Sequence, residues 1–235
     1  MITNSQNTAL NNLLEKIPDT ETFILYKGYC KYREQGLRKL AFEQLKLFIE
    51  EFKSYDLSSK IWFTDLILAN AESVKDGDYG PMPHTLKEII IKPTLILWAN
   101  FEPLNYLPLY WLAKFFYDHD ALRKALNINP LEQKPLIQDI EWKIGALYES
   151  THHLPHFYIG DVDADLILAD EIKHKIEGVI NEREKIRLHT EFNFYESLML
   201  SYKSWKISGT KDFTEWAKAN NKDCESGIKA FYYSK

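Results

Sequence analysis

The chain has 235 residues, of which 45% are hydrophobic, 27% charged and 14% aromatic. This length can bury a sizeable core, and the balance is that of a folded protein rather than a disordered one. The net charge of −5 at pH 7 argues against nucleic acid as the main partner. Aromatic side chains carry large apolar areas, so we expect them in the core or on a binding surface.

Cysteine usage and hydropathy point to a cytoplasmic protein without membrane contact. Cys30 and Cys224 lie far apart and form no CxxC motif, which favours two free thiols in a reducing compartment. The most apolar stretch, residues 89–99, is interrupted by Lys92 and Pro93 and is too short to span a bilayer. The first residues lack the basic-then-apolar order of a signal peptide.

Helical periodicity recurs along the chain, and the alternation typical of strands is nearly absent. Apolar positions 10, 13, 14 and 17 indicate a first helix. A second helix is expected to begin with a cap at Asp19 or Thr20 and to end near Gln35. Gly36 separates it from a third, whose expected apolar stripe consists of Leu37, Ala41, Leu45, Phe48 and Phe52.

A fourth helix is expected from about Ser58 to Val74, with an apolar face made by Trp62, Leu66 and Ala69. Residues 75–83 are rich in glycine and proline and form the clearest break in the chain. This break predicts a hinge or a long loop. We favour a loop within one helical domain that spans residues 1–235, because too few helices precede it for an independent domain.

Beyond the break, prolines at 93, 103 and 108 divide the chain into short helical pieces, one of which begins at Pro108. Residues 129–132 combine a capping residue, a proline and a glutamate, and predict the start of a helix that runs to about Ser150. Asn181 is expected to cap the last long helix. The apolar face of the helix before it is marked by Ala169, Ile172, Ile176 and Val179.

Within residues 29–48, the spacing of Tyr32, Gly36, Ala41, Leu45 and Phe48 resembles that of a tetratricopeptide repeat. A second stretch, residues 125–130, is similar to the closing helix of that repeat, although Tyr106 and Asp118 depart from the pattern before it. The resemblance implies an all-α fold in which antiparallel helix pairs stack into a short superhelix, and it implies no particular ligand. Lys53 stands where the repeat has a proline.

Residues 147–165 are similar to a segment of uncharacterised bacterial proteins, and that similarity implies no activity. The segment contains His152, His153, His156 and Asp161, which are ligand types for zinc, manganese or iron. They would serve a metal-dependent hydrolase, although the spacing is not HExxH and Pro155 prevents an undistorted helix.

A structural interpretation of the same segment competes with the metal hypothesis. Asp161, Asp163 and Asp165 precede an apolar helix, where carboxylates cap free N–H groups and complement the helix dipole. The three histidines would then be loop residues. We favour this interpretation, because short clusters of histidine and aspartate arise often without metal.

Aromatic residues crowd positions 98–117. Core burial is the favoured place for any one of them, and Trp111 and Phe115 share a helix face. Tyr106, Tyr110 and Trp111 are the candidate anchors for a ligand in the groove that stacked helix pairs create.

Functional motifs of the common enzyme classes are missing from the chain. GxGxxG, GxxxxGK[ST] and GxSxG do not occur, which lowers the expectation of an enzyme or of a bound cofactor. We therefore expect an interaction or adaptor module that binds a protein or peptide, with the metal-dependent hydrolase as the alternative. Self-association as a homodimer through exposed helix faces is a third possibility.

Overall fold

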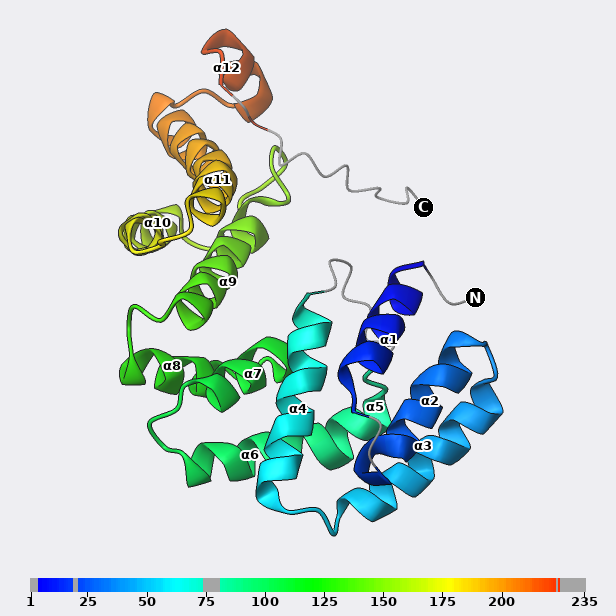
Figure 1. The fold of residues 1–235 in the computed structure, drawn as a ribbon. Helices are drawn as coiled ribbons and strands as arrows, with labels where there is room; N and C mark the ends of the chain where they lie inside the picture. The colour runs from blue at the N-terminus through cyan, green and yellow to red at the C-terminus, as the bar shows by residue number, and fades with distance from the viewer. Residues whose placement is uncertain (1–3, 19–20, 74–80, 223, 225–235) are drawn as a thin grey trace. The chain divides into compact units, whose positions relative to one another are not determined.

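The computed structural model describes residues 4–18, 21–73, 81–222 and 224, and every regular element within these ranges is helical (Figure 1). The all-α prediction is thereby confirmed. Contacts divide the chain into two compact units, 1–128 and 129–235. The single domain predicted for residues 1–235 stays a prediction, and most of the predicted break at 75–83 lies outside the described residues. No helix in the described ranges is long and apolar enough to cross a membrane.

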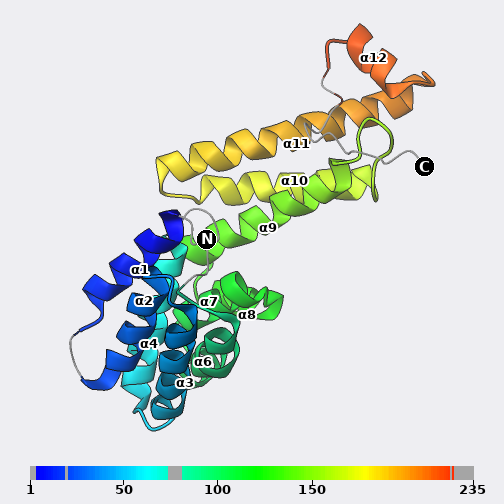
Figure 2. The ribbon, with the colours of Figure 1, turned by 90° about the vertical axis from the view of Figure 1, so that its right-hand side faces the viewer.

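The first unit is built from short helices that pack in sequence order. Its described elements are α1 (Asn4–Lys16), η1 (Glu21–Phe23), α2 (Ile24–Glu34), α3 (Arg38–Phe52), α4 (Leu57–Glu72), α5 (His84–Leu86), η2 (Lys87–Ile91), α6 (Lys92–Phe101), α7 (Leu107–Phe116) and α8 (His119–Ile128). The pair α2 and α3 lies side by side in both ribbon views (Figures 1 and 2). The second helix thus starts later than predicted, after a 3₁₀ turn, and the predicted cap at 19 or 20 lies outside the described residues.

A left-handed glycine makes the reversal between α2 and α3. Gly36 has φ 76°, a conformation that glycine adopts without the penalty of a Cβ. Ala41, Leu45 and Phe48 are buried to 0–1% exposure, so the predicted apolar stripe of α3 is confirmed at these positions. Leu37 was wrongly placed on that stripe: it is 45% exposed, because it precedes the helix as its N-cap residue.

An aromatic core fills the space beside α2 and α3. The ring of Phe63 from α4 lies 4.8 Å from Tyr26 and 4.9 Å from Phe48, measured between centroids. The hydroxyl of Tyr26 donates a hydrogen bond to the carbonyl oxygen of Pro81 at 2.5 Å, which satisfies its polar group in the core. Packed rings therefore account for much of the aromatic surplus in the composition.

The predicted apolar face of α4 was wrong at Trp62 and Ala69, whereas Leu66 is partly buried against the core. Trp62 is 41% exposed and Ala69 is also exposed, whereas Phe63, Ile67 and Leu68 are fully buried. Nearly every turn of α4 carries apolar residues on several sides, so its periodicity does not single out one face. The surrounding helices α1 and α6 decide which side is buried.

Residues 84–101 form one continuous helical segment. The sequence had predicted a division of this segment at Pro93. The elements α5, η2 and α6 follow one another without a gap, and η2 is a π-helical turn. Pro93 lies in the first turn of α6, where proline is tolerated. By contrast, α7 begins as predicted: Pro108 lies in its first turn and Asn105 Oδ1 accepts a hydrogen bond from the N–H of Leu107 at 2.9 Å.

The second unit contains α9 (Gln133–Thr151), α10 (Val162–Glu177), α11 (Glu182–Ser208) and α12 (Phe213–Ala219). The first three run side by side in Figures 1 and 2 and pack pairwise. Asn181 caps α11 as predicted, because its Oδ1 accepts hydrogen bonds from Arg183 N at 3.0 Å and Glu184 N at 3.2 Å. The predicted start of α9 was early, since residues 129–132 form a turn and the helix begins at Gln133.

A small cluster fixes α12, which the sequence did not predict. Leu154, Leu198, Phe213 and Ala217 are buried together. The ring of Phe213 lies 5.3 Å from that of Trp205 on α11. Because α12 is short, this packing rather than intrinsic propensity must hold it as a helix.

Candidate interaction surface

The outer face of α3 carries a shallow hollow of about 620 Å³. The helix turns its apolar stripe inward through Ala41 and Leu45, and the intervening positions therefore face solvent. The hollow is lined by Arg38, Lys39, Phe42, Glu43 and Lys46.

Phe42 forms the apolar centre of this hollow. Its side chain is 36% exposed, and its ring meets that of Tyr29 edge to face with 6.0 Å between centroids. The guanidinium groups of Arg33 and Arg38 lie 6.0 Å and 5.6 Å from the centre of the ring, within the range of cation–π attraction. The two arginines therefore border an aromatic surface that remains open to solvent.

The cations of the hollow are not neutralised by neighbouring acids. In the described part of the chain, no ion pair involves Arg38, Lys39 or Lys46. Arg33 Nε is buried and has no hydrogen-bond partner in the structure, which carries a free-energy penalty for a polar group. Glu43 is the acidic member of the lining, so the hollow keeps a positive excess around its ring.

Two of the three predicted groove residues prove to be core residues. Tyr110 is 2% exposed and Trp111 is 1% exposed, because α7 packs against both α6 and α8. Trp111 Nε1 donates a hydrogen bond to Asp65 Oδ1 at 3.0 Å, and the hydroxyl of Tyr110 donates one to Glu72. Tyr106 is half-buried and packs against the same core. Tyr110 and Trp111 are therefore not available as anchors for a ligand.

The histidines of the predicted metal site stack with aromatic rings. His152 lies 4.1 Å from His153, and His153 stacks on Phe157 at 4.5 Å, measured between ring centroids. Within the described ranges, no group of three or more His, Cys, Asp or Glu side chains could hold a metal ion. The set of His152, His153, His156 and Asp161 thus gains no support from the geometry of its side chains.

Of the three aspartates after these histidines, Asp161 caps α10 as the structural interpretation predicted, whereas Asp163 and Asp165 lie inside the first turn of the helix. Asp161 is the N-cap residue, and its Oδ1 accepts a hydrogen bond from Asp163 N at 2.9 Å. Lys203 Nζ lies 2.7 Å from Asp163 Oδ1 and lowers the pKa of that carboxyl by hydrogen bonding and charge. The hydroxyl of Tyr158 donates to Asp165 Oδ2 at 2.6 Å. Each carboxylate therefore has a structural contact.

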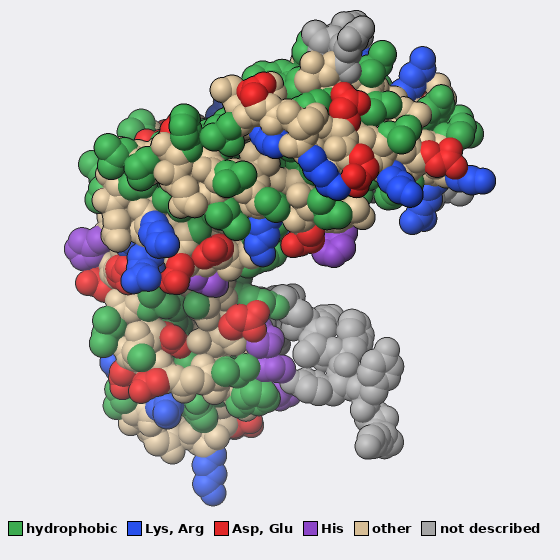
Figure 3. Space-filling model, turned by 90° about the horizontal axis from the view of Figure 1, so that it is seen from below, with side chains coloured by type: hydrophobic (Ala, Val, Ile, Leu, Met, Phe, Trp, Pro, Cys, Tyr) green, Lys and Arg blue, Asp and Glu red, His purple; other side chains and the backbone are tan. Residues whose placement is uncertain are grey.

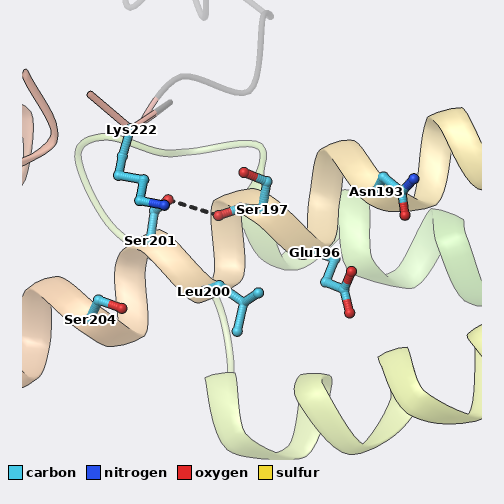
Figure 4. A pocket seen from close by; sticks show the side chains of 7 residues that line it. All are labelled: Asn193, Glu196, Ser197, Leu200, Ser201, Ser204 and Lys222. Atoms are coloured by element: carbon cyan, nitrogen blue, oxygen red, sulfur yellow. Dashed lines mark hydrogen bonds between the residues drawn. The ribbon is translucent and has the colours of Figure 1, made fainter. Parts of the chain in front are cut away.

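A second, smaller pocket of about 210 Å³ opens on α11 (Figure 4). Its serines offer hydroxyl groups, but Ser201 Oγ donates its hydrogen bond to the backbone oxygen of Ser197 at 2.8 Å, as the dashed line in Figure 4 marks. The Ser201 hydroxyl is therefore engaged with its own helix. The lining residues are Asn193, Glu196, Ser197, Leu200, Ser201, Ser204 and Lys222.

Comparisons with known proteins give no family for this chain. No model of a known protein family matches it, and no curated protein or solved structure matches it at a significant level. A proposal about function therefore has to rest on the exposed side chains of the chain. In the space-filling view, hydrophobic side chains reach the surface beside basic and acidic ones (Figure 3).

Proposed function

We propose that this protein is an interaction module that binds an acidic segment of a protein partner at the hollow on α3. The observation that carries the proposal is the unpaired basic lining around the exposed ring of Phe42. Carboxylates of the partner would pair with the cations, and one of its aromatic or aliphatic side chains would cover the ring. The expected binding mode is thus an apolar contact bordered by ion pairs.

We also propose that the protein is a short stack of helix pairs, similar in arrangement to tetratricopeptide repeats, and that it acts in the cytoplasm. The hairpin of α2 and α3 supports it, because Gly36 reverses the chain and the small Ala41 lies fully buried in α3. The free thiol of Cys30 is consistent with a reducing compartment. Tyr110 and Trp111 take no part in this binding mode, because both are buried in the core.

The test begins with a selection of short displayed peptides on the immobilised full-length protein. We expect acidic sequences that contain one aromatic or aliphatic residue. Binding of a selected peptide, followed by fluorescence anisotropy, should weaken about tenfold or more in Phe42→Ala, as for a central aromatic contact. Lys46→Glu should also weaken binding, and the wild-type affinity should fall as salt rises from about 0.05 M to about 0.5 M.

Matched variants separate the hollow from other exposed positions. Phe101→Ala removes an equally large ring that is 67% exposed on α6, and Lys124→Glu reverses an exposed charge on α8. Both should bind the peptide with wild-type affinity. Selected peptides without acidic residues, or equal affinity in Phe42→Ala, would contradict the proposal.

A further inference from the structure

The smaller pocket on α11, which we call the α11 pocket, lies on the side of this helix that faces away from its core. The helix contributes Ser197, Leu200, Ser201 and Ser204 to the lining. These residues recur at spacings of three and four along the helix, so they share one face. Leu200 is 49% exposed there. The small serine side chains thus leave a space that Leu200 borders with apolar surface.

The size and the chemistry of the α11 pocket fit a single aromatic side chain. Its volume is about 210 Å³, whereas pockets for small molecules hold roughly 300–1,000 Å³. Leu200 offers an apolar surface to a ring, and the Asn193 amide and the hydroxyls of Ser197 and Ser204 offer partners to a polar tip. Tyrosine combines a ring and a polar tip in one side chain.

The chain itself returns to the α11 pocket after α12. Lys222 lines the pocket, and its side chain reaches towards Ser201 in Figure 4. The N–H of Lys222 donates a hydrogen bond to the carbonyl oxygen of Ala217 at 2.9 Å. Cys224 packs, partly buried, against the cluster that Ala217 and Phe213 of α12 form with α11. The residues that follow therefore start beside α11.

Residues 225–235 lie outside the described residues, and their sequence is rich in rings. It contains Ile228 and the consecutive Phe231, Tyr232 and Tyr233. Ile228, Phe231 and Tyr232 stand at i, i+3 and i+4, the spacing of one face of a helix. Such a face is typical of a segment that packs into a groove between or along helices.

The same segment is long enough to cover the α11 pocket. Its eleven residues reach about 36 Å when extended and about 17 Å as a helix. The lining of the pocket on α11 runs from Asn193 to Ser204, about 17 Å along the helix axis. The segment can therefore span the pocket in either conformation.

We propose that residues 225–235 cover the α11 pocket of their own chain, with Tyr232 in the pocket and Phe231 beside it. The attachment of the segment at Cys224, next to the pocket, favours this occupant over a second copy. A short tether gives an effective concentration on the order of millimolar, which exceeds that of free chains at micromolar protein. The contact removes the rings and Leu200 from water.

The first test follows the reactivity of a thiol placed in the pocket. Ser204 is exposed in the described part of the chain, and Cys30 is buried. In full-length protein that carries Cys224→Ser, a Ser204→Cys substitution therefore supplies the fast-reacting thiol. Ellman's reagent should react with it about fivefold faster or more once Phe231 and Tyr232 are both changed to serine, since a site covered for about four fifths of the time is protected about fivefold.

A thiol on another helix provides the control. Ile167 on α10 is 75% exposed, and Ile167→Cys should react equally fast with and without the two serine substitutions. Circular dichroism of each variant establishes that the fold is retained. Phe42→Ala should leave the rate at position 204 unchanged, so failure here and failure of peptide binding at the α3 hollow are distinguishable.

Disulfide formation locates the segment directly. In the Cys224→Ser protein, Ser204→Cys and Tyr232→Cys together should form an intrachain disulfide on mild oxidation, because a disulfide needs Cα atoms within about 7 Å. Ile167→Cys paired with Tyr232→Cys should oxidise much more slowly.

Three outcomes would overturn this inference. The first is equal reactivity at position 204 with and without the substitutions of Phe231 and Tyr232. The second is a protection that grows with protein concentration, which would assign the cover to a second copy. The third is a pair of thiols at positions 204 and 232 that oxidises no faster than the control pair.

Discussion

Two aromatic side chains buried in the first unit each place a polar group against a hydrogen-bond acceptor. The indole N–H of Trp111 donates to Asp65, and the hydroxyl of Tyr26 donates to the backbone of Pro81. Cys30 lies in the same core with 0% exposure, and burial raises the pKa of its thiol to about 12. Trp111 and Tyr26 thus combine a large apolar area with a polar atom that is hydrogen-bonded. Their environment, and not their reactivity, explains their placement.

Cysteine labelling provides a test at the level of single residues. With its pKa raised from 9.0 to about 12, Cys30 has about a thousandfold smaller thiolate fraction at pH 8, and only the thiolate reacts. We expect Ellman's reagent to label Cys224, which is half-buried, well before Cys30. In Cys224→Ser, labelling of the folded protein should be slow and should become rapid in denaturant. Fast labelling of the folded variant would show that Cys30 is accessible.

At the scale of single elements, the ends of the helices follow from local chemistry. Asn181 and Asp161 cap α11 and α10 through bonds to backbone groups two or three residues away, so the sequence predicted them. Which face of a helix is buried depends on its neighbours, and the predicted face of α4 was wrong for that reason. The π-helical turn η2 has no sequence signal comparable to a cap or a glycine, and it was not predicted.

Two glycines of the second unit provide a matched test of backbone conformation. Gly209 ends α11 with φ 72°, whereas Gly145 lies inside α9, and an added Cβ at either position has no atom within 4 Å. Gly209→Ala should destabilise the protein by about 1 kcal/mol, because alanine disfavours the left-handed region. Gly145→Ala should stabilise it by about 0.5–1 kcal/mol through helix propensity. Urea denaturation measures both, and effects of the same sign would contradict the assignment.

At the scale of the whole molecule, the chain divides into two compact units at residue 128. Each unit has buried residues of its own, including the aromatic core of the first and the cluster of Phe213 in the second. The division coincides with the Asn129-Pro130 turn, which the sequence did reveal, but as the start of a helix. Whether a turn separates units depends on contacts between distant residues, and local patterns do not record these.

Tryptophan fluorescence can follow the two units separately, since the chain has six tryptophans. Trp62, Trp98 and Trp111 lie in the first unit, and Trp142, Trp205 and Trp216 lie in the second. In proteins with the tryptophans of one unit replaced by phenylalanine, Gly209→Ala should lower the urea midpoint reported by the second unit and leave that of the first unchanged. Equal shifts in both would mean that the units unfold as one.

The candidate sites show the same limit of sequence-based inference. Tyr110 and Trp111 were chosen as anchors for their aromatic rings, yet both are core residues. Phe42, which forms the centre of the α3 hollow, could have been found from its place beside the Ala41 and Leu45 stripe and between basic residues. The exposed residues of α6, which include Ile96, Leu97 and Phe101, were harder to predict, because they and the buried residues of α6 are equally apolar. Only the packing distinguishes them.

The π-helical turn at residues 87–91 sets the rotational register of the helix that follows it. A turn of this kind holds one residue more than an ordinary α-helical turn. Removing one residue there would rotate everything that follows by about 100° about the helix axis. Trp98 would then leave the core, and exposed residues such as Leu97 would turn towards it. The length of this one turn therefore decides which side of α6 faces the core.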